Sequence, residues 1–396
     1  MNPLLDLLHP YPFERLRTLL ADVVPNPDYD PINLSIGEPK HPTPSLVTEA
    51  LVAGLDGLSV YPATAGSMPM REALSGWLAR RYGIPAPDPG STVLPVNGSR
   101  EALFAFAQAV IDPGAGGWVL CPNPFYQIYE GAAVLAGARP WYVAQRADDG
   151  FRCRWEAIDE SVWAETRLVY VCSPGNPTGR VMDLQEWRLL FERSDRHGFV
   201  IAADECYSEI YFDTPPLGAL QAARRLGRDG YDRLVVFGSL SKRSSVPGMR
   251  SGYVAGDPGI LRRFLLYRTY HGSAMSLAVQ AASIAAWGDE AHVIDNRARY
   301  AAKFEAVTPV VSEALQTQRP EAGFYLWARV PGRDDAAFAR ELQRQYNVLV
   351  LPGSFLARTH EGANPGAGFV RIALVEGLEA CRRGAQRIVE FASEYR

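Results

Sequence analysis

The sequence predicts an α/β protein in which a mainly parallel sheet is sandwiched by helices and is followed by a smaller α/β unit. Strand-like and helix-like segments alternate from about residue 45 to 285, which is typical of a parallel sheet with helices on both faces. Within this stretch, five short apolar runs each end in a loop that carries a polar or aromatic residue. The alternation then breaks beyond Trp287, where a long amphipathic segment begins.

Length and composition limit the class of protein. A chain of 396 residues with 47% hydrophobic residues suits two domains, and we expect a large domain over 45–288 and a small domain made of 1–44 and 289–396. The net charge of −4 gives no general attraction to nucleic acid or to an anionic membrane. The five cysteines are scattered, the histidines lack metal-ligand spacing, and no uncharged apolar run could span a bilayer. We therefore expect a cytoplasmic protein with no metal, nucleic-acid or membrane partner.

Two short elements precede the alternation. The segment 12–20 places four apolar side chains together and predicts an amphipathic helix, with Arg15 and Arg17 on its solvated face. The segment 32–39, INLSIGEP, predicts a strand that enters a turn. Gly37 in that turn either lets the backbone approach a ligand closely or only forms the turn.

Chemically useful side chains follow the five buried runs. In chain order, the runs and the residues after them are 92–96 with Ser99 and Arg100, 118–121 with Tyr126, 167–172 with Asn176, 199–203 with Asp204 and Tyr207, and 234–237 with Ser239, Ser241 and Lys242. The carboxyl ends of parallel strands meet at one edge of a sheet, where ligands bind, so we expect these side chains to share one cleft. A buried ion pair is the alternative for Asp204 alone, but five coincident strand ends favour a site.

Two of these strand ends suit a phosphorylated ligand. A helix starts directly after Asn97-Gly98, and a strand, small residues and a helix start together present free backbone N–H groups to a phosphate. Lys242 has two serines before it and Arg250 after it, and Arg250 lies between Gly248 and Gly252. This neighbourhood suits an amine nucleophile beside a bound phosphate. A solvated Lys–Arg turn is the alternative for this stretch alone.

The segments beyond Trp287 predict the smaller unit. A helix is expected over about 289–315, and the strand-like and helix-like segments after it are 324–330, 335–346, 348–351, 369–373 and a final helix from Glu376. Arg371 lies inside the last strand between apolar neighbours. An arginine in that position is either paired with a structural carboxylate or directed at an anionic ligand.

In this order and spacing, the motifs resemble those of class I and II aminotransferases of pyridoxal-phosphate fold type I. The similarity covers nearly the whole chain, through LSIGEP, the Y-x4-G of Tyr61 to Gly66, NGSREAL, SPGNPTG, DECY, SLSK-x7-R and FVRIALV. The resemblance implies a seven-stranded sheet, pyridoxal 5′-phosphate as cofactor, small amino-acid and oxo-acid substrates, and a homodimer with shared active sites.

The resemblance also implies a role for each candidate residue. Lys242 would form the Schiff base, Asp204 would pair with the pyridine nitrogen, and Tyr207 and Asn176 would contact the phenolic oxygen. The ring would stack on Tyr126, and the residues around the phosphate would be Ser99, Arg100, Ser239, Ser241, Arg250 and, from the neighbouring subunit, Tyr61. The substrate α-carboxylate would be bound by Gly37, Asn176 and Arg371. The chain departs from the family at Cys206, which replaces the usual aliphatic residue, and at Arg100, where many members carry lysine or a small residue.

The segments LLHPYPFERLRTLL and YRTYHGSAMSLAVQ resemble bacterial succinyldiaminopimelate transaminases of lysine biosynthesis. This implies ping-pong transamination between N-succinyl-L,L-diaminopimelate and 2-oxoglutarate or glutamate, with aspartate or a broader range of amino acids as the alternative. A second carboxylate on the substrate would need a further cation, for which Arg100 is the first candidate and Arg15 or Arg17 the next.

Two hypotheses from other classes remain. The same cofactor residues would also serve β-elimination or decarboxylation. Aminotransferase-like domains also occur in regulators fused to DNA-binding modules, but the sequence before residue 30 shows no helix-turn-helix and the net charge is negative.

Overall fold

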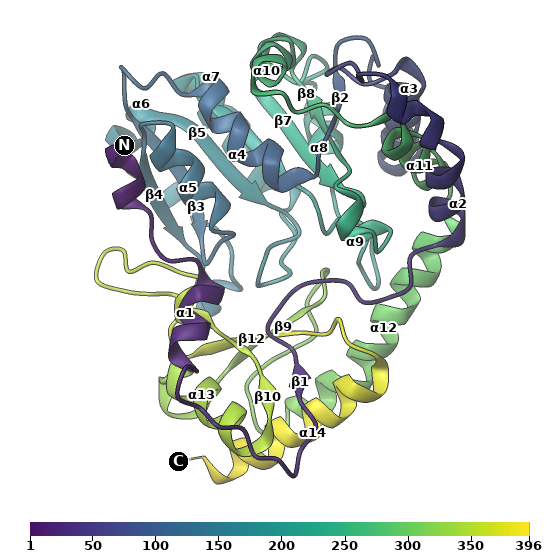
Figure 1. The fold of residues 1–396 in the computed structure, drawn as a ribbon. Helices are drawn as coiled ribbons and strands as arrows, with labels where there is room; N and C mark the ends of the chain where they lie inside the picture. Colours follow the sequence, from purple (N-terminus) through teal and green to yellow (C-terminus); the bar gives the residue numbers. More distant parts are fainter. Residues whose placement is uncertain (396) are drawn as a thin grey trace.

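The computed structural model describes residues 1–395, and its largest sheet has seven strands (Figure 1). The strands lie in the order β2-β8-β7-β6-β5-β3-β4, with the bounds β2 Val93–Val96, β3 Trp118–Asn123, β4 Arg139–Ala144, β5 Thr166–Cys172, β6 Val200–Asp204, β7 Leu234–Ser239 and β8 Gly252–Gly256. The predicted α/β class and the seven-stranded sheet are confirmed.

Six of the seven strands run in the same direction. Strand β8 is antiparallel to both of its neighbours, β2 and β7, and the remaining neighbours pair in parallel. The carboxyl ends of the five predicted strands therefore meet at one edge of the sheet. The strand-like runs of the sequence did not predict β8, whose GYVAG is rich in glycine, or β4, which starts at Arg139-Pro140.

Both faces of the sheet are covered by helices. In β5, Val169 and Val171 belong to the core on one face, and Leu168 and Tyr170 belong to the core on the other. The first face is covered by α2 (Ser45–Ala53), α3 (Met68–Tyr82), α6 (Glu160–Glu165), α7 (Leu184–His197), α8 (Ala219–Arg225) and α11 (Leu277–Gly288). The second face is covered by α4 (Ser99–Val110), α5 (Ile128–Leu135) and α10 (Pro258–His271).

Local sequence sets the ends of these helices, and α7 is a clear case. The carboxylate of Asp183 accepts hydrogen bonds from the backbone N–H groups of Gln185 and Glu186, and Glu186 bonds back to Asp183, which completes a capping box. The helix ends at His197 because Gly198 adopts the left-handed conformation, with φ of 77°.

The rest of the chain forms two smaller sheets. One pairs β1 (Ile32–Asn33) with β10 (Val348–Leu349), and the other contains β11 (Leu351–Pro352), β12 (Phe369–Ala373) and β9 (Tyr325–Arg329). Their core is closed by α12 (Ala291–Val311), α13 (Asp335–Tyr346) and α14 (Leu378–Glu394). In Figure 1, α12 runs along one side of the molecule between the large sheet and the smaller ones.

Two predicted strands are wrong in extent. The segment 32–39 is a strand only over β1, because the side chain of Asn33 accepts a hydrogen bond from the backbone N–H of Ser35 at 3.0 Å and so competes with the sheet ladder. The segment 348–351 is divided into β10 and β11, which belong to different sheets. The helix expected at 335–346 has those bounds, and the helix expected at about 289–315 is shorter, at Ala291–Val311.

Short helices complete the description. They are η1 (Pro3–Leu7), α1 (Pro12–Leu19), η2 (Leu55–Ser59), η3 (Ala147–Asp149), η4 (Trp155–Ala157), α9 (Leu240–Arg243), η5 (Pro247–Met249), η6 (Pro331–Arg333) and η7 (Gly353–Phe355). Over residues 1–395, every helix is too short or too polar to cross a membrane.

Candidate active site

A cavity of about 600 Å³ lies at the carboxyl edge of the large sheet. The last residues of β5, β6 and β7, which are Cys172, Asp204 and Ser239, all line it. Every candidate residue predicted from the sequence lines it as well, except Tyr61 and the two alternative cations Arg15 and Arg17. The lining residues that the sequence did not predict are Tyr11, Pro12, Phe13, Ile36, Glu38, Gln127, Cys172, Cys206, Pro247, Tyr325 and Leu356.

Lys242 lies in the short helix α9, directly after β7, and its amine is inside the cavity. Its Nζ donates a hydrogen bond to the carbonyl oxygen of Gly37 at 2.5 Å and lies 5.2 Å from the centre of the Phe324 ring. Burial lowers the pKa of Lys242 to about 8, because burial disfavours the charged ammonium. A substantial neutral fraction near physiological pH suits a nucleophile and proton carrier.

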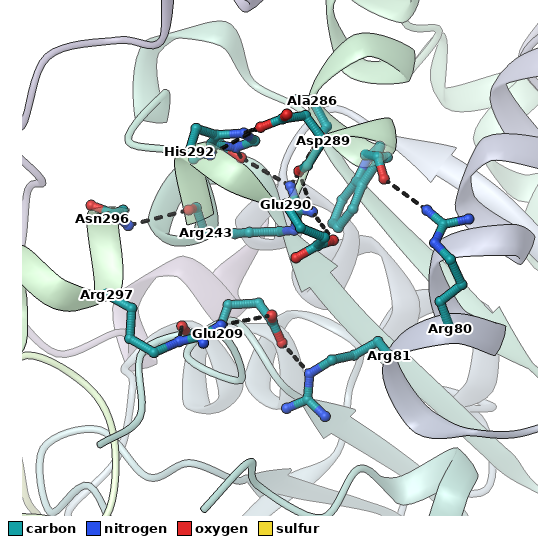
Figure 2. A network of polar contacts seen from close by, with 12 residues as sticks. Arg80, Arg81, Glu209, Arg243, Ala286, Asp289, Glu290, His292, Asn296 and Arg297 are labelled. Carbon is teal, nitrogen blue, oxygen red and sulfur yellow. Dashed lines mark hydrogen bonds and ion pairs between the residues drawn. The ribbon is translucent and has the colours of Figure 1, made fainter. Parts of the chain in front are cut away.

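The residue after Lys242 anchors the turn in the protein. The guanidinium of Arg243 lies 4.8 Å from the ring centre of Trp287, and it donates to the carbonyl oxygen of Ala286 at 2.7 Å and to Glu290 at 2.6 Å. Figure 2 shows these contacts beside the Asp289–His292 pair. A fully buried arginine with an ionic partner fixes the backbone next to the lysine.

Position 37 has to be a glycine because the side chain of Tyr325 occupies the space that a Cβ would fill. A Cβ at this position would lie 1.8 Å from the hydroxyl oxygen of Tyr325, so only glycine leaves room for that phenol. The Tyr325 hydroxyl in turn lies 3.0 Å from the hydroxyl of Tyr207. One predicted alternative was that Gly37 lets the backbone approach a ligand closely. In the structure a close approach does occur at Gly37, but the group that approaches is the side chain of Tyr325 in the same chain.

Asp204 is buried without an ionic partner among residues 1–395. Its carboxylate accepts hydrogen bonds from the hydroxyl of Tyr129 at 2.7 Å and from the backbone N–H of Cys206 at 3.1 Å. Burial raises the pKa of Asp204, since these neutral donors only partly offset the loss of water. The structural ion pair considered for Asp204 is not found in the described part of the chain, and the carboxylate is free to accept a cationic N–H from a ligand.

Arg371 is also buried, and within the described residues it has no carboxylate partner. It donates to the side-chain oxygen of Asn176 at 3.1 Å and to the carbonyl oxygen of Ser35 at 2.8 Å. Its Nε is buried and unpartnered. A guanidinium that lines the cavity and has no ionic partner among residues 1–395 is suited to a carboxylate ligand.

A set of hydroxyl and cationic groups lies at the start of α4. Ser99 is the first residue of that helix, and the Ser239 hydroxyl accepts a hydrogen bond from the backbone N–H of Ser241 at 3.0 Å. Arg250 adopts the left-handed conformation, with φ of 56°, and lies against Gly98, where a Cβ would be 2.2 Å from its Nη2. Helix N–H groups, hydroxyls and a guanidinium are the donors that phosphate requires.

Arg100 bridges two tyrosines at the cavity. Its Nε donates to the hydroxyl of Tyr126 at 2.5 Å and its Nη2 donates to the hydroxyl of Tyr11 at 3.0 Å. Tyr11 precedes α1, so the N-terminal segment lies against the cavity. The helical pattern of residues 12–20 predicted α1 but carried no signal that Tyr11 or Phe13 would line a site.

The other predicted cations lie outside the cavity. Arg15 packs over the ring of Phe355 at 4.1 Å, and Arg17 is exposed and pairs with Glu14 at 2.5 Å. Tyr61 is fully exposed on the protein surface. Within one chain it therefore cannot contact a ligand in the cavity.

These residues fit pyridoxal 5′-phosphate. An amine faces the cavity, an unpaired buried carboxylate suits a pyridine N–H, and the donors around Ser99 and Arg250 suit a phosphate. Arg371, which lines the cavity and bonds only to neutral groups among residues 1–395, leaves a second anion position for a substrate carboxylate.

Comparisons with known proteins agree with this chemistry. The family described as "Aminotransferase class I and II" matches residues 29–388. Among curated proteins, the chain is 34% identical to 4-dedimethylamino-4-oxo-anhydrotetracycline transaminase OxyQ of Streptomyces rimosus, over 90% of this chain and 92% of that protein. It is 32% identical to LL-diaminopimelate aminotransferase of Desulforudis audaxviator, over 95% of both chains.

Solved structures are similar over the whole chain. An aminotransferase from Neisseria meningitidis is 52% identical, with a TM-score of 0.96 and 100% coverage of both chains. A probable N-succinyldiaminopimelate aminotransferase from Thermus thermophilus is 27% identical, with a TM-score of 0.85, and the match covers 96% of this chain and 98% of that one. The chain therefore belongs to the class I and II aminotransferases, fold type I enzymes that depend on pyridoxal 5′-phosphate and act on amino acids and oxo acids.

Proposed function

We propose that the enzyme transfers an amino group between N-succinyl-L,L-diaminopimelate and 2-oxoglutarate, and that it runs from glutamate in lysine biosynthesis. The observation that carries the proposal is that Arg100 lines the cavity and, among residues 1–395, bonds only to uncharged groups. In the described part of the chain, the cavity is lined by four cationic side chains, Arg100, Lys242, Arg250 and Arg371, and by the carboxylates of Glu38 and Asp204. We assign Lys242 and Arg250 to the cofactor and Arg371 to the α-carboxylate. Arg100, which the family resemblance also puts near the phosphate, bonds here only to two phenols and is therefore available for a further anion.

The charge of the substrate's far end supports the succinylated compound. The distal carbon of L,L-diaminopimelate carries an ammonium as well as a carboxylate, so that end has no net charge, and a nearby guanidinium would repel its ammonium. Succinylation turns that ammonium into a neutral amide and adds a carboxylate, so the distal end becomes anionic. Glutamate also has a distal carboxylate, and one cation can therefore serve both substrates in turn, as ping-pong kinetics require.

We propose the following roles for the residues of this chain. The bound cofactor supplies an electron sink for the bonding pair of the Cα–H bond. Asp204 holds a proton on the pyridine nitrogen, and Tyr207 with Asn176 binds the phenolic oxygen. Lys242 moves the proton between the substrate Cα and the cofactor C4′. Arg371, with Gly37 and Asn176, orients the α-carboxylate, and Tyr126 packs on the ring.

The substrate proposal is tested by comparing kcat/KM for N-succinyl-L,L-diaminopimelate, L,L-diaminopimelate and aspartate. We expect the succinylated substrate to be preferred. Arg100→Gln should lower its kcat/KM by the equivalent of a charge-assisted hydrogen bond, about 1.5–3 kcal/mol or roughly 10–150-fold. The loss of kcat/KM in Arg100→Gln should be smaller when free alanine is the substrate, because alanine has no distal carboxylate.

Arg17→Gln is the matched control, because it removes an arginine of the N-terminal segment that pairs with Glu14 outside the cavity. Preference for unmodified L,L-diaminopimelate or for aspartate would contradict the substrate assignment. An Arg100→Gln enzyme with unchanged selectivity would contradict the role of Arg100.

We also propose that two chains form a dimer in which each supplies Tyr61 to the phosphate of the other. The apolar side chains of Val52, Leu58 and Val60 are 66%, 67% and 56% exposed, close in sequence to the fully exposed Tyr61. A group of exposed apolar side chains on one segment is typical of a protein interface. A second copy that covers this segment would bring Tyr61 to a site that it cannot reach in its own chain.

Mixing two weakened variants tests the shared site. Lys242→Ala and Tyr61→Phe chains, unfolded and refolded together, should give heterodimers with one intact site each, and random pairing restores about a quarter of wild-type activity. The mixture should exceed the sum of the two parents. A fully active monomer in sedimentation velocity, or a mixture no better than its parents, would exclude the shared site.

The organisation of the chain and its location complete the proposal. We propose the domain division 45–288 against 1–44 with 289–396, supported by the packing of Ile32 and Leu34 in the same core as α13 and α14. The cytoplasmic location is supported by five unpaired cysteines in the described chain.

A further inference from the structure

One face of α12 is directed at the backbone that carries Lys242. His292, Asn296, Tyr300 and Lys303 recur at the spacing that places side chains on one side of a helix. The Nε2 of His292 lies 2.8 Å from the hydroxyl of Ser244. Figure 2 shows the side chain of Asn296 directed at the main chain of Arg243. The helix that packs against the smaller sheets therefore also contacts the lysine turn.

Asn296 supplies the missing partners at the end of α9. Its Nδ2 donates to the carbonyl oxygens of Lys242 at 3.1 Å and Arg243 at 3.2 Å. The last carbonyls of a helix have no partner within the helix, and Asn296 is buried with them. Its Oδ1 lies 3.2 Å from the hydroxyl of Ser245, which has a φ of 52°. A non-glycine residue in that region is strained and has to be held by its surroundings.

The same amide fixes the protonation of His41. Carbonyl oxygens only accept hydrogen bonds, so the Asn296 nitrogen faces the lysine turn and its Oδ1 faces His41 Nδ1, 2.7 Å away. His41 Nδ1 therefore carries the proton, and its Nε2 accepts a hydrogen bond from Lys303 Nζ at 2.8 Å. Burial lowers the pKa of His41, which keeps the ring neutral in this arrangement.

His41 belongs to the segment that also holds the lysine's amine. Four residues before it, the carbonyl oxygen of Gly37 accepts the hydrogen bond from Lys242 Nζ. The segment 37–41 thus binds the two ends of Lys242: the amine through Gly37 and the main chain through His41 and Asn296. Movement of either the segment or α12 would shift the lysine.

We propose that Asn296 and His41 are positioning residues for Lys242 and couple the placement of its amine to α12. The role of Lys242 as the reacting amine rests on the proposed function. The contacts that hold Lys242, through Gly37 at its amine and through Asn296 at its main chain, do not depend on that role. Neither Asn296 nor His41 lines the cavity, so both act through the lysine.

The amine of Lys242 can be followed without the cofactor. The chain contains three lysines, Lys40, Lys242 and Lys303, so competitive acetylation with acetic anhydride over a range of pH gives one peptide for each in mass spectrometry. In the full-length, cofactor-free protein we expect Lys242 to titrate near its lowered pKa of about 8. Cys206, Arg371, Glu38 and Arg250 are the charged or titratable groups that act on it most strongly.

Asn296→Ala should release the lysine turn and let water reach the amine. The pKa of Lys242 should rise by about one pH unit, a part of the roughly three to five pH units by which full burial can move an amine. In the loaded enzyme, kcat should fall by about 100-fold, the cost of a misplaced catalytic group, with a much smaller change in KM. Ser194→Ala is the control, because it removes a buried hydroxyl on α7 that donates to the carbonyl oxygen of Phe199, far along the chain from the lysine turn.

A pair of His41 variants distinguishes the positioning of Lys242 from a general effect on protein stability. His41→Asn places an amide N–H where Nδ1 stood and should keep the pKa of Lys242 and kcat close to wild type, whereas His41→Gln reaches toward Lys303 instead and should behave like Asn296→Ala. If Asn296→Ala folds and leaves both readouts unchanged, or if the two His41 variants are indistinguishable, the proposal is overturned. A Lys242→Ala enzyme that stayed active would refute the proposed function instead.

Discussion

Lys242→Ala is expected to abolish transamination while leaving a folded protein. Among residues 1–395, Lys242 is the one amine that lines the cavity, and its removal takes away both the covalent attachment point and the proton carrier. Proton transfer by a positioned side chain alone contributes about 10²–10⁴-fold. With the attachment lost as well, we expect kcat/KM to fall by more than roughly 10⁴-fold. Alanine leaves Arg243 and its contacts in place, so thermal unfolding should change little.

Borohydride reduction of the cofactor-loaded enzyme checks the attachment directly, because the labelled peptide identifies the lysine among only three. Lys40→Ala is the control, since Lys40 is partly exposed and pairs with Glu376 at 2.7 Å. A label on Lys40 or Lys303, or a Lys242→Ala enzyme within tenfold of wild type, would show that another residue reacts.

Asp204→Asn should cost the second largest loss, about 10²–10⁴-fold in kcat, on the scale of one proton-transfer contribution. The Tyr129 hydroxyl bonds to Oδ2 of Asp204 and the Cys206 N–H to Oδ1. In asparagine the amide oxygen can accept from the Cys206 N–H while the amide N–H donates to the oxygen of Tyr129, so the local fold should persist. A neutral amide, however, cannot hold a proton on a pyridine nitrogen, and the rate of Cα–H cleavage should fall. The measurement is single-turnover kinetics with glutamate.

Glu205→Gln provides the matched control in the next residue. Glu205 is equally buried and accepts from the Tyr82 hydroxyl at 2.7 Å, but it does not line the cavity. Burial raises the pKa of Glu205 to about 7, so the neutral amide resembles a form that the protein already populates near neutral pH. Equal losses in the two variants would mean that the effect of Asp204→Asn is structural.

The sequence predicted the cavity well because its chemistry lies at strand ends. Asp204 and Lys242 follow short apolar runs, and in a parallel sheet such residues must converge at one edge. Tyr325 escaped prediction because it lies at the start of an ordinary apolar strand, and only the space above Gly37 reveals its role. Arg100 was identified, but its contact with Tyr11 depends on how the N-terminal segment lies over the sheet, which no periodicity encodes.

The fold shows the same division between local and distant causes. The bounds of α13 follow from an uninterrupted helical pattern, whereas the extent of β1 depends on a side chain that competes for a backbone N–H. The contacts of Asn296 on α12 with the lysine turn could not be predicted from the sequence for a similar reason. Its partners lie 54 and 53 residues earlier, at Lys242 and Arg243, and an isolated asparagine in a helix carries no signal of such a contact.

The three lysines have a consequence for the handling of reactive aldehydes. Lys303 is buried against His41, Lys40 is tied to Glu376, and every other basic side chain among the 40 Lys and Arg residues is an arginine, which stays protonated and does not condense with aldehydes. Apart from the terminal amine, Lys40, whose side chain is 45% exposed, is then the main competitor of Lys242 for free pyridoxal phosphate. In a Lys40→Ala protein, reductive trapping at low cofactor concentration should accordingly saturate near one equivalent per chain, so that the absorbance of the trapped protein counts functional sites.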